Sequence, residues 1–178
     1  MLVILIILLL LATIIYIVSN KPDKFHIERS VTIAAPPEVI IPQLSNFSNW
    51  KNWSPWEKID PRLQRHYSGP AEGPGAVYAW RGNNKVGEGL MEITSADDYH
   101  LVIRLEFFKP FAANNRVELQ LTPNDSYTRV TWTMEGQNQL GNKFAGLLLN
   151  MDKLIGKDFE TGLSNLKQVC ETHAHTSF

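Results

Sequence analysis

The sequence predicts an α+β domain: an antiparallel sheet with one long C-terminal helix on one of its faces. About seven segments alternate apolar and polar residues, as half-buried strands do. Turn signals rich in Gly, Asn, Asp and Pro separate the later segments, so consecutive strands can pair antiparallel. At the C-terminus, apolar residues recur every three or four positions, which is the period of a helix face. A series of strands followed by a helix fits an α+β architecture.

The N-terminal part of this domain is expected to hold one strand and two short helical segments. Residues 25–34 alternate and are rich in β-branched residues, so they predict a strand. Pro36 and Pro37 end that strand and suit the first turn of a helix. Residues 46–56, with the sequence NFSNWKNWSPW, predict a short helical or turn segment that carries three tryptophans.

Further strands are expected between residues 63 and 135. The segment 75–81, GAVYAWR, is the strongest of them, and the segment 63–68 is the weakest. Gly82-Asn83-Asn84 is a hairpin turn signal after the strong segment. The other expected strands lie at 85–95, 101–108, 116–122 and 128–135.

One long helix is expected from Met151 onward. Its apolar residues lie at positions 151, 155, 159, 163, 166 and 170, and these spacings fit one helix face. Gly156 and Gly162 each cost a helix about 1 kcal/mol relative to Ala. We expect these small residues to let the helix lie close to the sheet. Asp158 and Glu160 are expected on its solvent face.

Residues 1–19 predict a single transmembrane helix. Residues 2–18 contain no charge, no Pro and no Gly, and at ~1.5 Å per residue they span about 25 Å, close to the thickness of a bilayer core. A cleaved signal peptide would need a basic start and a small-x-small cleavage site, and neither is present. A buried helix would need a polar face, which is also absent. The membrane is therefore an expected partner through residues 1–19.

The domain organisation follows from this helix. Residues 20–24 form a polar linker, residues 25–172 the domain, and residues 173–178 a flexible tail. Basic residues follow the apolar helix and none precedes it, so the positive-inside tendency places the domain in the cytoplasm. The expected localisation is a single-pass membrane protein with a cytoplasmic soluble domain.

Composition argues against several classes of function. The net charge is −1, so no basic surplus exists for phosphate contacts, and no nucleic-acid partner is expected. Cys170 is the single cysteine, which leaves no intrachain disulfide and no cysteine-cluster metal site. The sequence has no P-loop, dinucleotide-binding motif or zinc-binding helix, and its histidines lack ligand spacing. We expect neither a metal nor a cofactor.

The inner face of the sheet is expected to be large, aromatic and rich in sulfur. Strand alternation places Trp132 and Met134 on one face of their segment. Met91 shares its face with two glycines, Gly87 and Gly89, which remove side chains where space could be needed. Such a face is either a solid core or the lining of a cavity. The patterns by themselves favour the solid core.

Residues 25–56, FHIERSVTIAAPPEVIIPQLSNFSNWKNWSPW, resemble the opening of the START-like superfamily in its polyketide cyclase/dehydrase and lipid-transport branch, also called SRPBCC proteins. The matching features are the first strand, the A-P-P-E helix start and the N-W-x-x-W-x-P-W segment. Two later stretches, YSGPAEGPGAVYAWRGNNKVGEGLMEI and GKDFETGLSNLK, resemble the same branch, so the resemblance covers about residues 25–172. It implies a helix-grip fold, in which a curved antiparallel sheet wraps the long C-terminal helix and leaves a cavity between them. It implies no particular chemistry, because the family includes cyclases, dehydrases and lipid carriers.

With a cavity in place, the expected partner is a small hydrophobic molecule, either a lipid or a polyketide-like compound. The expected ligand-binding residues are Arg29, Trp53, Tyr78, Trp80, Met91, Phe107, Asn115, Trp132, Met134, Ile155 and Phe159. Trp53 is placed by the resemblance alone. Arg29 lies on the apolar face of its strand, where it would need a carboxylate or an anionic ligand; the favoured alternative is a strand end that turns it to solvent. Asn115 could hydrogen-bond a ligand at the cavity mouth or serve a turn.

Three functions stay open at this point. A binding module is favoured, because no acid–base pair stands out and no catalytic residue is identified. The alternative is a cyclase or dehydratase that acts on a hydrophobic substrate, with Arg29 as the first residue to consider. The third is an interaction scaffold that exposes Trp50, Trp53 and Trp56 as a docking patch, which would be unusual for a monomer.

Overall fold

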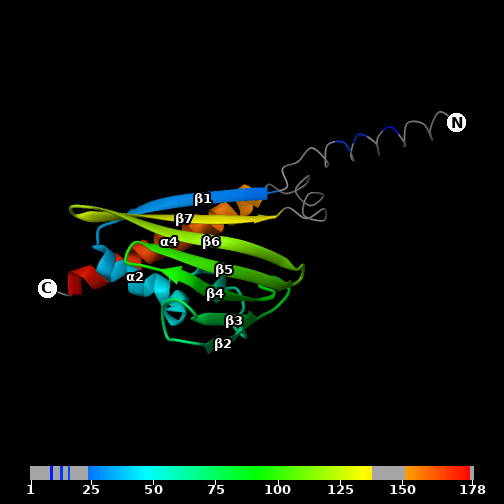
Figure 1. Ribbon diagram of the computed structural model, residues 1–178, viewed down its shortest axis with the longest axis horizontal. Coiled ribbons are helices and arrows are strands. Elements are labelled where there is room, and N and C mark those ends of the chain that lie inside the picture. The colour runs from blue at the N-terminus through cyan, green and yellow to red at the C-terminus, as the bar shows by residue number, and fades with distance from the viewer. Residues whose placement is uncertain (1–8, 10–12, 14–15, 17–23, 138–150, 177–178) are drawn as a thin grey trace.

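A seven-stranded antiparallel sheet and a long C-terminal helix form the domain (Figure 1). The computed structural model describes residues 24–137 and 151–176, together with Leu9, Thr13 and Tyr16. The strands are β1 (Lys24–Ile33), β2 (Gln64–Ser68), β3 (Val77–Arg81), β4 (Glu88–Ala96), β5 (His100–Lys109), β6 (Ala113–Asn124) and β7 (Tyr127–Gln137). The helices are α2 (Pro37–Ser45), the short 3-10 helices η1 (Phe47–Asn52) and η2 (Pro55–Lys58), and α4 (Met151–Thr176).

The strand order is β1-β7-β6-β5-β4-β3-β2, and every neighbouring pair is antiparallel. From β2 to β7 each strand pairs with the next one along the chain. The chain between β1 and β2 contains α2, η1 and η2, so these two strands end at opposite edges of the sheet (Figure 1). α4 runs along one face of the sheet and packs against β1 and α2. The α+β class and the antiparallel sheet are confirmed.

Alternation along the strands sets the inner face as the sequence predicts. Val117, Leu119 and Leu121 of β6 are buried, and so are Trp132 and Met134 of β7. One boundary differs in a way that matters for the site. β6 begins three residues before the expected start at residue 116, so the two asparagines at its start belong to the strand and not to a turn.

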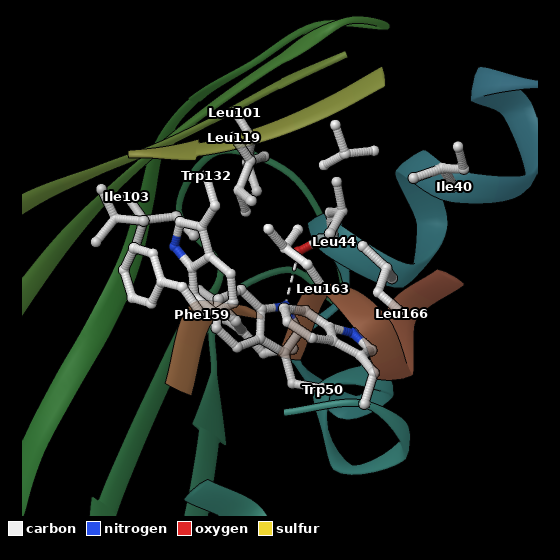
Figure 2. Packing of buried hydrophobic residues seen from close by; sticks show 14 of the residues in the cluster. Ile40, Leu44, Trp50, Leu101, Ile103, Leu119, Trp132, Phe159, Leu163 and Leu166 are labelled. Atoms are coloured by element: carbon white, nitrogen blue, oxygen red, sulfur yellow. Dashed lines mark hydrogen bonds between the residues drawn. The ribbon is translucent and has the colours of Figure 1, made fainter. Parts of the chain in front are cut away.

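A solid core fills the space around the C-terminal half of α4. Leu163 and Leu166 of this helix pack with Ile40 and Leu44 of α2 and with Leu119 of the sheet, and all five are almost fully buried (Figure 2). The solid-core alternative therefore describes this end of the domain.

Trp50 of η1 and Trp53, the residue that follows η1, lie inside the domain. Trp50 and Trp53 are 2% and 0% exposed, and their indole N–H groups donate to the backbone carbonyls of Leu44 (2.9 Å) and Gln43 (3.0 Å). These bonds fasten η1 to the end of α2. Trp56, the third indole of the expected docking patch, is partly buried against the same core. The three indoles therefore form no exposed patch, and the interaction-scaffold hypothesis is wrong in its main feature.

The favoured prediction that Arg29 turns to solvent at a strand end is wrong. Its guanidinium lies on the inner side of β1, donates to Glu160 (Nε to Oε1, 2.8 Å) and pairs with Asp152 (Nη1 to Oδ1, 3.1 Å), both on α4. The guanidinium fits against the helix because Gly156 has no side chain; a Cβ at this position would collide with it. Gly162 likewise faces the Trp132 ring. The two glycines thus provide the close approach of helix and sheet that the sequence predicts.

The prediction of a single-pass membrane protein is wrong on this structure. Among the described residues, no helix is both long and apolar enough to cross a membrane. α4 has the length, with 26 residues, but carries charged residues along it. Most of the predicted helix at residues 1–19, and residues 20–23 of the linker, lie outside the described residues. At the other end α4 continues to Thr176, into the segment expected to be a tail.

Candidate functional site

A cavity of about 310 Å³ lies between the inner face of the sheet and the N-terminal half of α4. This volume falls at the lower end of the range for small-molecule pockets. Strands β3 to β7, η1, η2 and α4 all contribute to its walls. Nine of the predicted site residues line it: Tyr78, Trp80, Met91, Phe107, Asn115, Trp132, Met134, Ile155 and Phe159. Arg29 and Trp53 do not: Arg29 faces α4, and Trp53 packs behind Trp132 with ring centroids 5.5 Å apart.

Trp132 and Phe159 separate the cavity from the solid core. Their rings stack with centroids 4.2 Å apart and planes 12° apart (Figure 2). Trp50 and Trp56 meet the Trp132 ring edge-on at 6.0 and 5.8 Å. The buried Nε1 of Trp132 has no hydrogen-bond partner among the described residues. This aromatic cluster, Trp50, Trp53, Trp56, Trp132 and Phe159, closes the inner end of the cavity.

The glycine of β4 does not itself leave open space. The Trp80 indole of β3 lies over Gly89, where a side chain would collide with the ring. Trp80 also meets Phe107 of β5 edge-on at 5.6 Å, and its Nε1 donates to the carbonyl of Val86 (3.3 Å). Gly89 therefore seats an aromatic wall of the cavity.

A buried carboxylate that the sequence reasoning missed lies in the cavity wall. The side chain of Glu57, in η2, is 5% exposed. Its Oε1 accepts a hydrogen bond from the Tyr78 hydroxyl (2.5 Å), and its Oε2 accepts one from Arg65 Nε (2.6 Å). Arg65 also donates to the backbone carbonyl of Glu57 (3.1 Å). Glu57 and Tyr78 line the cavity, whereas Arg65 contacts Glu57 from behind.

Electrostatics keep Tyr78 protonated. Burial raises its pKa far above the ordinary value of a phenol, and the hydrogen bond to Glu57 and the charge of that carboxylate raise the pKa further. The hydrogen bond from Arg65 to Glu57 likewise raises the pKa of the guanidinium, against the effect of burial. No periodicity in the sequence could have found Glu57, because η2 is a single short turn and its partners come from β2 and β3.

Two further polar side chains line the cavity. Asn115 is buried on the inner face of β6, lies over Gly136 of β7, and has no side-chain hydrogen bond to another described residue. Asp158 of α4 lines the cavity, where the sequence predicts a solvent-facing residue. It does so because it lies three residues after Ile155, so the two share a helix face. No ion pair joins Asp158 to any other residue that the structure describes.

The opposite end of the cavity reaches the surface beside the β5–β6 turn. Phe111 in this turn is 75% exposed, and Pro110 and Gln137 beside the cavity are exposed as well. A ligand could enter at this rim, which we call the cavity mouth. Within the described residues, no group of three His, Cys, Asp or Glu side chains could hold a metal ion.

Comparisons with known proteins agree with this geometry. Residues 24–171 match the model of the family described as polyketide cyclase / dehydrase and lipid transport. The Zhui aromatase/cyclase from Streptomyces sp. R1128 has a similar structure, with a TM-score of 0.61, 14% identity, and coverage of 83% of this chain and 94% of that one. A protein from Thermobifida fusca has a TM-score of 0.61, 22% identity, and coverage of 82% and 92%. The di-domain ARO/CYC protein BexL from the BE-7585A biosynthetic pathway has a TM-score of 0.58, 12% identity, and coverage of 90% and 53%. No curated protein matches the chain. At these identities the likeness shows the fold.

Proposed function

The chain belongs to the polyketide cyclase / dehydrase and lipid transport family, and on that premise we propose that it binds a small hydrophobic ligand in the cavity between the sheet and α4. The observation that carries the proposal is the cavity itself. It holds about 310 Å³ beside a well-packed core, and its walls are mostly apolar. Transfer of an apolar ligand from water to such walls is favourable.

The walls favour an apolar body with few polar contacts. Most of the lining side chains are aliphatic or aromatic, and a few polar groups interrupt them: Ser54, Glu57, Tyr78, Asn115, Gln137 and Asp158. Small-molecule pockets generally have this composition, in which apolar contacts supply affinity and polar groups set orientation. In this proposal Trp80, Met91, Trp132 and Phe159 contact the apolar body of the ligand. Arg29 and Trp53 support the site from outside the cavity.

A thermal-shift screen of lipids and polycyclic aromatic compounds tests the proposal. At a concentration of 100 times its Kd, a ligand stabilises the folded state by about 2.7 kcal/mol, which raises Tm by roughly 5–10 °C for a domain of this size. Native mass spectrometry of the freshly purified protein shows in parallel whether a small molecule co-purifies.

A matched pair of variants localises the binding. Ala113→Trp places a large ring in the cavity, because Ala113 lines it. Asn114→Trp places the same ring on the exposed face of the same strand. Binding should be lost in the first variant and kept in the second. A screen without any hit, or equal binding by both variants, would show that the cavity is not a ligand site.

An enzyme is the second candidate function, and one observation favours it. Glu57 and Tyr78 put a hydrogen-bonded carboxylate and phenol in the cavity wall, as acid–base catalysis in a cyclase or dehydratase would need. The test is turnover of a bound ligand. Tyr78→Phe should abolish product formation but keep binding if the pair is catalytic. If the protein only binds, neither the native protein nor the variant should form a product.

A further inference from the structure

The charged groups in the cavity wall are carboxylates, whereas an anionic lipid head group would need cationic partners. We propose that the ligand presents a hydrogen-bond donor, a hydroxyl or a protonated amine, to Glu57 and Tyr78, and that the cavity selects against anionic head groups. This inference rests on the proposed function and adds the chemical class of the ligand to it.

The charges that line the cavity are negative. Glu57 and Asp158 are carboxylates in its wall, and none of the described lining residues is Lys, Arg or His. Arg65, which pairs with Glu57, is not a lining residue. A carboxylate or phosphate in this space would lose its hydration beside a like charge, with no described cation to replace the water.

The hydrogen-bonding capacity that remains at Glu57 and Tyr78 is for accepting. Tyr78 has one O–H, and that group already donates to Glu57 Oε1 at 2.5 Å. The phenolic oxygen keeps a lone pair, and each carboxylate oxygen of Glu57 can accept a second bond. Trp80, the indole nearest to Tyr78 along β3, has given its N–H to the Val86 carbonyl. A ligand hydroxyl or ammonium therefore finds partners at Glu57 and Tyr78, whereas a carbonyl or carboxylate oxygen finds no donor at these two residues.

The aromatic walls strengthen the case for a cationic head group. Tyr78 and Trp80 both line the cavity, with ring centroids 6.0 Å apart. The faces of such rings attract ammonium groups, most strongly where water is excluded. Asn115 can accept as well as donate, so it is compatible with either head group.

Four naphthalene compounds that differ only in the head group test the inference, with the full chain and isothermal titration calorimetry at pH 7. The compounds are 2-naphthylmethanol, 2-naphthylmethylamine, 2-methylnaphthalene and 2-naphthoate. The alcohol and the amine should bind at least tenfold more tightly than 2-methylnaphthalene, and 2-naphthoate should bind more weakly than 2-methylnaphthalene. A preference for the amine over the alcohol would assign part of the effect to charge.

Two variants connect the selectivity to the named groups. Glu57→Gln removes the charge at nearly constant shape and should reduce the ratio of amine to naphthoate affinity at least fivefold. Asp158→Asn alters a residue without a described partner, so it should fold even where the Glu57 variant does not, and it should reduce the same ratio.

The outcomes separate this inference from the proposed function. If 2-naphthoate binds as tightly as the alcohol and the amine, the inference is overturned while the cavity remains a ligand site. If none of the four compounds binds, the compounds found in the thermal-shift screen are used in their place. A screen compound that binds through an anionic head group overturns the inference. If neither the series nor the screen yields a binder, the proposed function itself fails.

Discussion

Replacing Trp132 by alanine should destabilise the domain by about 3 kcal/mol. The indole is 2% exposed, stacks on Phe159, and meets Trp50, Trp53 and Trp56 edge-on. Removal of a packed core aromatic costs about 3–5 kcal/mol, and aromatic pairs of this geometry contribute about 0.5–1.5 kcal/mol each beyond area burial. The substitution also removes a buried N–H without a described partner, and burial of such a group costs about 1–3 kcal/mol. The relief offsets part of the loss, so the result should lie at the lower end of the packed-core range.

Phenylalanine at the same position is the matched control. It keeps the stacking on Phe159 and lacks the unpaired N–H, so it should lose less than half of what alanine loses. Urea denaturation followed by circular dichroism measures both, because tryptophan fluorescence changes with the substitution itself. A loss below about 1.5 kcal/mol for Trp132→Ala, half the packed-core minimum, would refute the view that this ring joins cavity and core. Equal losses for both variants would refute the stabilising role of the stacked ring, because both variants lack the N–H and only phenylalanine keeps a ring on Phe159.

Three further predictions concern other parts of the domain. Gly156→Ala forces the Arg29 guanidinium away from its ion pairs, which as exposed pairs contribute about 0–1 kcal/mol each, but alanine gains about 1 kcal/mol in the helix. Urea titrations at two salt concentrations should therefore show a change in the free energy of unfolding below ~1 kcal/mol, with a weaker salt dependence than in the native protein. The pKa of Asp60 is lowered, chiefly by the hydrogen bond from the Arg62 backbone N–H, so the contribution of this carboxylate to stability is present above the unfolded pKa of about 3.9 and is lost as pH falls through the folded pKa. Asp60→Asn should therefore make the fall of Tm below about pH 4 less steep. Burial raises the pKa of the Cys170 thiol to about 12, so iodoacetamide at pH 8 should label it far more slowly in the native protein than in denaturant.

Local periodicity explains how much of the fold could be predicted. A strand exposes alternate residues to opposite faces, so a segment such as residues 128–135 carries its own assignment of Trp132 and Met134 to the core. The spacing of apolar residues from 151 to 170 likewise carries the inner face of α4. Eight of the nine correctly predicted residues of the cavity wall, all except Asn115, could be found for this reason, because each lies on an element whose period is visible in the chain.

Contacts between distant segments could not be predicted in the same way. Asn115 depends on a strand boundary three residues earlier than the alternation indicates, and Arg29 depends on Gly156 more than 120 positions away along the chain. Glu57 receives its role from Arg65 on β2 and Tyr78 on β3, which meet it only once the sheet has formed.

The sequence by itself determined the class of the fold, the faces of the strands and helix, and the apolar character of the cavity wall. The tertiary structure alone decided that α4 packs solidly along its C-terminal half and borders a cavity along its N-terminal half. It also decided that a carboxylate and a phenol meet in the wall of that cavity. The physical reason is that periodicity is a property of one segment, whereas a cavity and its polar groups depend on the distances between segments that the chain order leaves free.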